Sequence, residues 1–319
     1  EMTGSLDEVH VANVRDEIER LRALEKRREF ILESIEGQGK LTPELISLLR
    51  QAETVSALED IYLPFKPKRR TKATIAREKG LEPLAQLIFD QGKIDVEGEA
   101  EKFVSEEKEV KSANDALAGA RDIVAEWINE NAEARDKIRK LFKRSATIKS
   151  KVLRGKEEAG EKFKDYFDWE ENLMGCPSHR LLAIRRGESE EILSIHIMPS
   201  EEEAIDILVN QFVKSNNSAS AQVKLACDDA YNRMMQGSIE TEMRMMTKEL
   251  ADEKAIQVFA DNLRELMLAS PLGQKAILAI DPGFRTGCKV VVLDKQGKLL
   301  DDTVIYPHEQ NKIFQTKQL

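Results

Sequence analysis

The chain has 319 residues, and its 49 Lys and Arg against 58 Asp and Glu give a formal net charge of −9. Hydrophobic residues make up 41% of the sequence, charged residues 34% and aromatic residues 5%, which is typical of a helix-rich protein with wide polar faces. The acidic total argues against a protein that coats nucleic acid over its whole surface, but it allows one local basic site. Apolar runs fall short of the roughly 20 residues that span a bilayer, and a signal peptide is not visible, so we predict no membrane association.

The number and spacing of the cysteines limit which cellular compartment and which metal sites are compatible with the sequence. Cys176, Cys227 and Cys288 are scattered and odd in number, so they form neither a disulfide framework nor a zinc-binding spacing. A reducing cytoplasm is the location that this pattern favours. Cys176 and His179 have the chemistry of metal ligands, but one pair falls short of a structural site. We therefore predict no metal and no cofactor.

Helical periodicity dominates the first 145 residues. Apolar residues recur at three- and four-residue steps through residues 6–36, which predicts one long helix ended by Gly37 and Gly39. Thr42 and Pro43 supply the N-cap and first-turn proline of a short second helix. Further helices are predicted at about 55–62, 72–79, 82–90, from Ser112 onward and at 132–143, with a polar and partly loop segment at 91–111. Several short helices joined by tight turns suggest a helix-turn-helix-like unit.

Residues 61–80 reverse the sign of the chain's charge, with seven Lys or Arg and one acid, Glu78. Pro64 and Pro67 prevent the preceding helix from continuing, because each lacks an amide donor and pushes its predecessor out of the α region. One interpretation is an ordinary solvated loop. The other is a phosphate-binding patch on a proline-stiffened turn. In the second interpretation five cations, here called the basic corner, neutralise phosphates: Lys66, Lys68, Arg69, Arg70 and Lys72.

The predicted helix at 132–143 offers a second basic surface. Its apolar positions Ile138, Leu141 and Phe142 are expected to face inward. The cations on its other side are expected to point outward, and an ordinary solvated helix face is the competing interpretation: Arg135, Lys137, Arg139, Lys140, Lys143 and Arg144.

Residues 146–200 change to an alternating pattern. Residues 147–153 and 192–198 alternate like strands, and we expect them to pair, with a short helix at about 179–186 between them. His196 lies on the second strand, where a surface or half-buried role is expected rather than catalysis.

Residues 201–272 return to helical periodicity, with helices expected near 201–214, 219–236, 239–250 and 253–269. Five methionines stand out in this region and are expected to fill the core rather than form a contact surface: Met234, Met235, Met243, Met245 and Met246.

The segment from Pro271 to Gly273 marks the clearest domain boundary. After it, strands are predicted at 276–280, 289–293 and 299–306, with a hairpin turn at 294–298. The predicted fold is thus mainly α, with a helix-turn-helix-like N-terminal part, a long central helix, a small β element and three antiparallel C-terminal strands. The predicted parts are residues 1–145, 146–200, 201–272 and 273–319.

Three motifs carry a resemblance to a known family. They are Tyr62-Leu-Pro-Phe-Lys-Pro-Lys-Arg-Arg-Thr-Lys72, Pro177-Ser-His-Arg-Leu-Leu-Ala-Ile-Arg-Arg-Gly187, and Asp281-Pro-Gly-Phe-Arg-Thr-Gly287 with Ile305-Tyr-Pro-His308. In this order they closely resemble the Tex family of bacterial transcription accessory proteins. Thr3-Gly4-Ser5-Leu6 also looks like a family segment, and the likeness covers essentially the whole chain.

The resemblance implies a helical N-terminal region with a helix-turn-helix-like part and a long central helix, then an RNase-H-like, resolvase-related domain. It also implies helix-hairpin-helix modules and an OB-type RNA-binding domain after that. Because the sequence opens on Glu1-Met2 and stops three strands into the RNase-H-like part, we expect a fragment. The family's likeness to a eukaryotic elongation factor and histone chaperone implies partners in the transcription machinery.

Asp281 is the one enzyme-like position. RNase-H-like nucleases place a metal ligand at the end of the first strand, and two-metal cleavage needs several converging carboxylates. Asp294 lies at the hairpin turn, while Asp301 and Asp302 are strand neighbours that face opposite sides. We therefore predict no catalytic residue and interpret Asp281 as a vestigial metal ligand.

Three functional hypotheses follow. The first is a non-enzymatic transcription accessory protein that binds RNA and/or DNA mainly through the phosphate backbone, with weak sequence preference. The second is a protein–protein interaction scaffold of the transcription machinery, and the third, less favoured, is a metal-dependent nuclease. The exposed edge of the C-terminal strands could also pair with a second copy of the chain.

Overall fold

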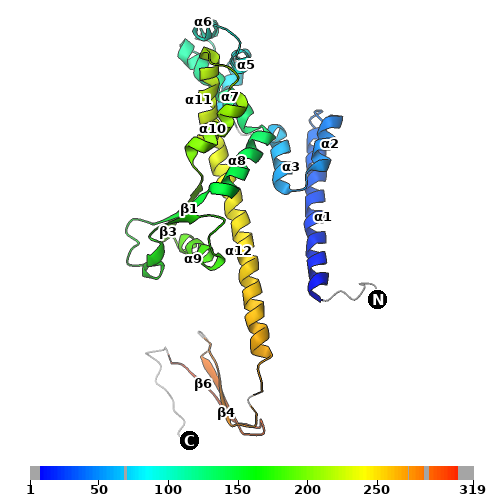
Figure 1. Cartoon of the computed structure of the whole chain (residues 1–319), viewed down its shortest axis with the longest axis vertical. Coiled ribbons are helices and arrows are strands. Elements are labelled where there is room, and N and C mark those ends of the chain that lie inside the picture. Colours follow the sequence, from blue (N-terminus) through cyan, green and yellow to red (C-terminus); the bar gives the residue numbers. More distant parts are fainter. Residues whose placement is uncertain (1–7, 68–69, 272, 284–286, 308–319) are drawn as a thin grey trace. The chain divides into compact units, whose positions relative to one another are not determined.

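The computed structural model describes residues 8–67, 70–271, 273–283 and 287–307 (Figure 1). The chain divides into two compact units, residues 1–255 and residues 256–319. The predicted mainly α fold with two small antiparallel sheets is confirmed. The finer division into four parts stays a prediction. No helix among the described residues is both long enough and apolar enough to cross a membrane.

Three N-terminal helices share a core of their own. They are α1 (Glu8–Glu36), α2 (Pro43–Gln51) and α3 (Val55–Tyr62), and they match the predicted helices. Thr42 and Thr54 cap α2 and α3, because their side chains accept hydrogen bonds from the backbone N–H groups three residues on. The buried residues of this N-terminal core are Leu24, Ile31, Ile35, Leu49, Ala52, Leu58 and Tyr62.

A second, larger core runs through the rest of the first unit. It is built on the helices α4 (Lys72–Glu78), α5 (Glu82–Asp90), α6 (Val96–Glu101), α7 (Ala113–Asn129), α8 (Ala132–Ser145), α10 (Glu201–Phe212) and α11 (Ser218–Asp229). Helix α7 packs against α4, α5, α6 and α11. Helix α6 falls in the segment predicted as polar and partly loop. Only Val96 and Ala100 are buried on it, which is too short a repeat to show helical periodicity.

The small sheet of this unit has three strands rather than the two predicted. Strands β1 (Thr147–Val152) and β3 (Leu193–Met198) pair antiparallel, as expected, and β2 (Asp168–Asn172) adds to the other edge of β1. Strand β2 was not predicted, because its mostly acidic sequence lacks the alternating apolar residues that indicate a strand. Helix α9 (Ser178–Ser189) packs on β3, and His196 is exposed on the opposite face, as predicted.

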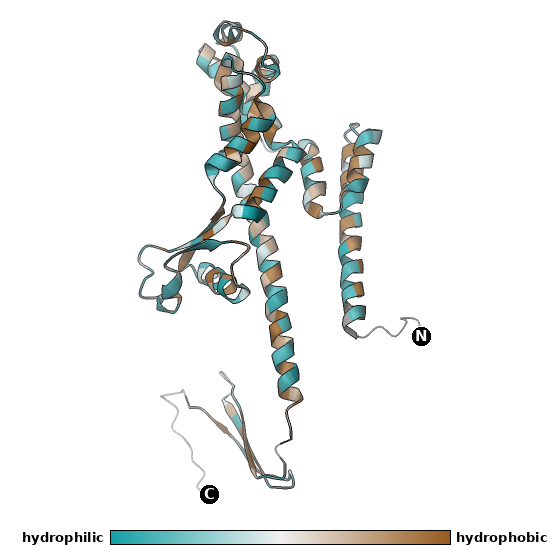
Figure 2. Ribbon diagram, viewed as in Figure 1, coloured by the Kyte–Doolittle hydropathy of each residue, from teal (hydrophilic) through white to brown (hydrophobic). Residues whose placement is uncertain are grey.

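One continuous helical segment replaces the separate helices predicted after residue 218. Helix α11 passes through a π-helical turn, Ala230–Met235, into α12 (Gln236–Met267), so the predicted break between residues 250 and 253 is wrong. Neither Gly nor Pro stands at that point to end a helix. The buried positions of α12 form a narrow stripe: Ile239, Met243, Thr247 and Ala251. Figure 2 shows hydrophobic and hydrophilic residues alternating along α12.

The methionines of this segment divide between the core and the surface. Met235 and Met243 are fully buried, as the core interpretation expects, whereas the Met245 side chain is 61% exposed.

The second unit contains the predicted three-stranded meander. Strands β4 (Ile277–Asp281), β5 (Cys288–Leu293) and β6 (Leu299–Ile305) pair antiparallel in that order. The carboxylate of Asp294 accepts hydrogen bonds from the backbone N–H groups of Gln296 and Lys298, which closes the predicted hairpin turn.

Gly119 sets how closely α7 approaches α4 and its following turn. A Cβ atom at Gly119 would lie 2.4 Å from Cδ1 of Leu81 and 3.3 Å from Cβ of Ala76, and both neighbours are buried. Gly237 in α12 has no atom within 4 Å of the same position. The two glycines therefore differ in packing while both lie in helices.

We expect Gly119→Ala to lower the free energy of unfolding, because an overpacking cost of about 1–3 kcal/mol outweighs the helix-propensity gain of up to about 1 kcal/mol. Gly237→Ala should raise it by roughly 0.5–1 kcal/mol, since only the propensity gain applies. Urea unfolding followed by far-UV circular dichroism measures both. A Gly119→Ala chain as stable as wild type would contradict the packing argument.

Candidate nucleic-acid interface

The basic corner begins where α3 ends. After Tyr62 the chain makes a 3-10 turn at Leu63–Phe65, and the backbone N–H of Lys66 closes it on the Tyr62 carbonyl at 3.0 Å. The buried Tyr62 shares a 2.8 Å hydrogen bond between its hydroxyl and Ser34 Oγ of α1, and Gln38 Nε2 donates to the Phe65 carbonyl at 2.8 Å. The start of the corner is therefore fastened on both sides of Pro64, to α1 through Ser34 and to the turn after α1 through Gln38.

The described cations of the corner lie at the surface. The Lys66 side chain is 52% exposed with its Nζ 3.6 Å from Glu59 Oε2, and Arg70 is 69% exposed with Nη2 2.7 Å from Glu78 Oε2. Lys72 is exposed at the start of α4. Lys68 and Arg69 lie outside the described residues. Exposed ion pairs of this kind contribute about 0–1 kcal/mol, so phosphate groups can replace these carboxylates at little cost.

Helices α4 and α5 follow the corner and are joined by residues 79–81 with Gly80 at φ +79°. That this pair is the predicted helix-turn-helix-like unit stays a prediction. In such motifs the second helix enters the major groove. The exposed side of α5 instead carries Glu82, Gln86 and Asp90. An acidic face is repelled by phosphates, so α5 is a poor recognition helix and the cations that precede α4 are the better candidates.

A hollow of about 420 Å³ continues from Lys72 between α4, α7 and the 105–111 loop. Lys79 and Lys111 also line it, and Lys79 Nζ donates to the Glu109 carbonyl at 3.0 Å. Sequence reasoning missed Lys111, because only the fold brings it beside α4. Acidic residues also line the hollow, among them Asp122. Burial raises the pKa of Asp122, and the nearby positive charges of Arg233 and Lys72 only partly oppose this effect.

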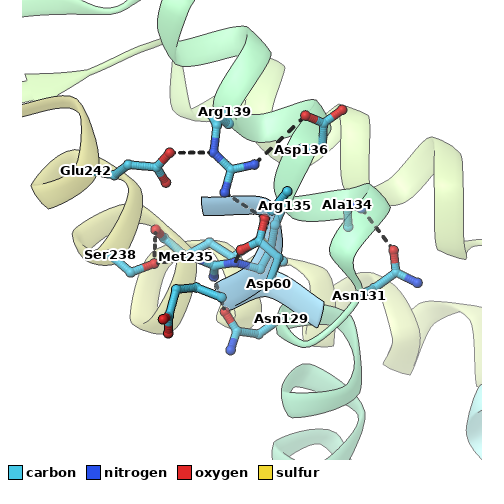
Figure 3. Close-up of polar contacts among 12 residues, drawn as sticks. Asp60, Asn129, Asn131, Ala134, Arg135, Asp136, Arg139, Met235, Ser238 and Glu242 are labelled. Carbon is cyan, nitrogen blue, oxygen red and sulfur yellow. Dashed lines mark hydrogen bonds and ion pairs between the residues drawn. The ribbon is translucent and has the colours of Figure 1, made fainter. Parts of the chain in front are cut away.

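The outward direction predicted for Arg135 and Arg139 on α8 is wrong. Arg135 and Arg139 point inward and are each 9% exposed, because both bind the carboxylate of Asp60 on α3, which is 6% exposed (Figure 3). Arg135 Nε lies 2.6 Å from Asp60 Oδ1, and Arg139 Nη2 lies 2.6 Å from Oδ2. We call these three residues, with Glu242 of α12, the Asp60 clamp.

Glu242 completes the clamp by binding Arg139 Nε at 2.6 Å. The pKa of Arg139 is raised overall. Burial alone would lower this pKa, but the hydrogen bonds and negative charges of Glu242 and Asp60 outweigh the effect of burial. Arg139 therefore stays charged inside the protein.

The remaining α8 cations are largely neutralised at the surface. Lys137 pairs with Glu133, Lys140 with Asp136 and Arg144 with Glu203. Lys143 is exposed, and within the described ranges it takes part in no ion pair. This helix face is thus closer to the ordinary solvated surface that was the competing interpretation.

Asp281, interpreted as a vestigial metal ligand, is not joined by the other described carboxylates of the C-terminal strands. Asp281 is exposed at the end of β4, Asp294 is engaged by its own turn, and Asp301 accepts a hydrogen bond from the Asp302 backbone. Among the described residues, no group of three or more His, Cys, Asp or Glu side chains could hold a metal ion. Burial raises the pKa of the Cys176 thiol to about 11, which disfavours the thiolate that binds metals.

Comparison with known proteins gives two family matches. Residues 91–259 match the model described as Tex central region-like, and residues 275–319 match the Tex protein YqgF-like domain. The second match confirms the RNase-H-like assignment of the C-terminal strands.

Similar proteins cover nearly the whole chain. The transcriptional accessory protein Tex of Neisseria gonorrhoeae is 40% identical over 99% of this chain and 42% of its own length. Protein tex of Bordetella pertussis is 40% identical over 98% of this chain and 41% of its own length. The human S1 RNA-binding domain-containing protein 1 is 25% identical over 97% of this chain and 32% of its own length. The chain thus spans about 42% of the length of the similar bacterial proteins.

We expect Arg139→Ala to lower the free energy of unfolding by about 3–5 kcal/mol, because it removes one of the two partners of the buried Asp60 carboxylate and the partner of the half-buried Glu242. Lys140→Ala, the neighbouring exposed cation on the same helix, should change it by less than about 0.5 kcal/mol. Thermal or urea unfolding of both variants makes the comparison. Equal effects would mean that the Asp60 clamp is not a buried ion network in solution.

Proposed function

The chain belongs to the Tex family, and we propose that it is a non-enzymatic transcription accessory protein that binds nucleic acid through the basic corner. The observation that carries the proposal is local: on a chain of net charge −9, the cations Lys66, Arg70 and Lys72 are exposed between the end of α3 and the start of α4, after a turn whose first residues are fastened to α1. The names of similar proteins support a role in transcription and nucleic-acid binding. One is a transcriptional accessory protein, and another is named for an S1 RNA-binding domain.

The contacts made by the corner are directed to the phosphate backbone. Lysine ammonium groups act as point charges, and α5, the helix that follows α4, presents acids on its exposed side. Backbone contacts position a protein on RNA or DNA but carry no sequence information directly. Weak sequence preference follows. The three cysteines are all free, which supports a cytoplasmic setting for this activity.

A second candidate function is an interaction scaffold, and one surface favours it. The first half of α1 exposes Val11, Val14, Ile18 and Leu21 at three- and four-residue steps. Such a stripe fits a helix of a partner in the transcription machinery. A second copy of the chain is another partner, since β4 and β6 are the edges of their sheet. Apolar association strengthens or stays constant with added salt, whereas phosphate binding weakens, so light scattering across a salt series separates the two.

If the corner binds phosphates, about five neutralised charges should give a slope of roughly −4 to −5 for log K against log salt on duplex DNA. Changing Lys68, Arg69, Arg70 and Lys72 to Glu should abolish this binding. Labelled single-stranded RNA and duplex DNA, titrated by fluorescence anisotropy, measure it.

The control for this experiment makes the same charge change elsewhere. Four exposed lysines on α1, α8, β1 and α11 are changed to Glu: Lys26, Lys143, Lys151 and Lys224. If net charge alone matters, both variants lose binding equally, and the corner is not the site. If wild type fails to bind at low salt, the proposed function is wrong for this chain.

We also propose that Asp281 supports no nuclease reaction here, because the described carboxylates do not converge on it. Asp281→Asn should therefore leave RNA and DNA intact to the same extent as wild type, with Mg²⁺ or Mn²⁺ present. Gel analysis of labelled substrates over hours checks this. Metal-dependent cutting by wild type that disappears in Asp281→Asn would overturn the non-enzymatic assignment.

A further inference from the structure

The Asp60 clamp lies directly before the basic corner. Asp60 is on the last turn of α3, two residues before Tyr62, where the 3-10 turn toward the cations begins. Both of its carboxylate oxygens are used, one by Arg135 and one by Arg139 (Figure 3). Two separate anchors on one carboxylate fix the direction of the side chain, and hence the rotation of the end of α3 against α8.

The clamp continues from α8 to α12. Arg139 Nε binds Glu242 at 2.6 Å, and Arg135 Nη2 donates to Ser238 Oγ at 3.1 Å. The Ser238 hydroxyl in turn donates to the Met235 carbonyl at 3.0 Å, in the π-helical turn. Three helices distant in sequence therefore meet at one carboxylate.

This polar junction stands between two apolar cores. Leu58 and Tyr62 on the same helix belong to the N-terminal core, whereas Ile138 and Phe142 on α8 belong to the larger one. The contact of α3 with α8 is the main described contact between the elements of the two cores. Buried ion pairs add little net stability compared with apolar residues of similar size, but their geometry is specific. The clamp is better explained by the orientation it imposes than by the stability it adds.

We propose that Asp60 is a positioning residue for nucleic-acid binding, which holds the start of the basic corner at Lys66 in a fixed orientation on α8 and α12 through Arg135 and Arg139. The inference rests on the proposed function of the corner. For the affinity of the Asp60→Asn variant, this proposal and simple electrostatics predict changes in opposite directions. Removing the negative charge of Asp60 should favour phosphate binding by charge alone, but loss of position should disfavour it.

The test compares Asp60→Asn with Asp136→Asn. Both remove one negative charge, and Asp136 also faces Arg139, at 3.8 Å, but from the exposed side of α8. Binding of labelled single-stranded RNA is measured by anisotropy at one low salt concentration, after circular dichroism shows each variant folded. We expect Asp60→Asn to bind about tenfold more weakly than wild type and Asp136→Asn to bind within about twofold or more tightly. If Asp60→Asn binds as tightly as Asp136→Asn, the positioning role is wrong.

A second variant covers the case in which Asp60→Asn does not fold. Arg139→Lys keeps the net charge but replaces the planar fork with a single ammonium, so it cannot hold Asp60 and Glu242 in the same geometry. Weakened RNA binding by folded Arg139→Lys, with Lys140→Arg as its matched control, supports the proposal. Unchanged binding overturns it.

Hydrogen exchange separates this inference from the proposed function. The backbone N–H of Lys66, which closes the turn on Tyr62, should exchange faster in Asp60→Asn or Arg139→Lys than in Asp136→Asn. If the wild-type chain does not bind RNA, the proposed function is wrong. Faster exchange confined to the clamp variants still supports positioning of the corner by Asp60, and equal exchange in all variants overturns it.

Discussion

A carboxylate removed from water must find charged partners, and this requirement organises the junction between the two cores of the first unit. Asp60 is 6% exposed on a helix whose other buried residues are apolar. Its burial is tolerable only because two guanidinium groups meet it, each at hydrogen-bonding distance. Those guanidinium groups need a further acceptor, and Glu242 on α12 supplies it. The positions of α3, α8 and α12 are thus coupled by one requirement for charge balance.

This coupling has a consequence for the surface. Because Arg135 and Arg139 are used inside, α8 loses two of the cations that would have made it a basic face, and three of its other four cations are paired with acids. In our proposal, the basic corner rather than α8 is therefore the site for a polyanion. Asp60 accounts for the inward direction of two α8 arginines, and the proposal gives it the anchoring of the corner as well.

Local features of the sequence predicted most elements, because their causes are local. Thr42 and Thr54 cap helices, Pro64 ends one, and Asp294 with Gly297 makes a hairpin turn, each through contacts within a few residues. The inward direction of Arg135 could not be predicted in the same way, because its partner Asp60 lies 75 positions away. Helical periodicity places a cation at the surface by default. Only the packing of α3 on α8 reverses that assignment.

The candidate site shows the same division between local and distant causes. Its charge reversal and its proline-stiffened turn are visible in the sequence, whereas the exposure of Glu82 and Asp90 on α5 depends on which side of α5 packs against α7. The corner's own ion pairs also come from the fold. Lys66 lies near Glu59 of α3, and Arg70 binds Glu78 of α4.

These ion pairs bear on affinity as well as on geometry. A phosphate must displace a carboxylate from each of Lys66 and Arg70, so the gain per contact is smaller than for a free cation in the same place. A rigid turn offsets part of that loss, because fewer backbone conformations are given up on binding. Binding at this corner is therefore expected to depend more on its fixed orientation than on its number of charges.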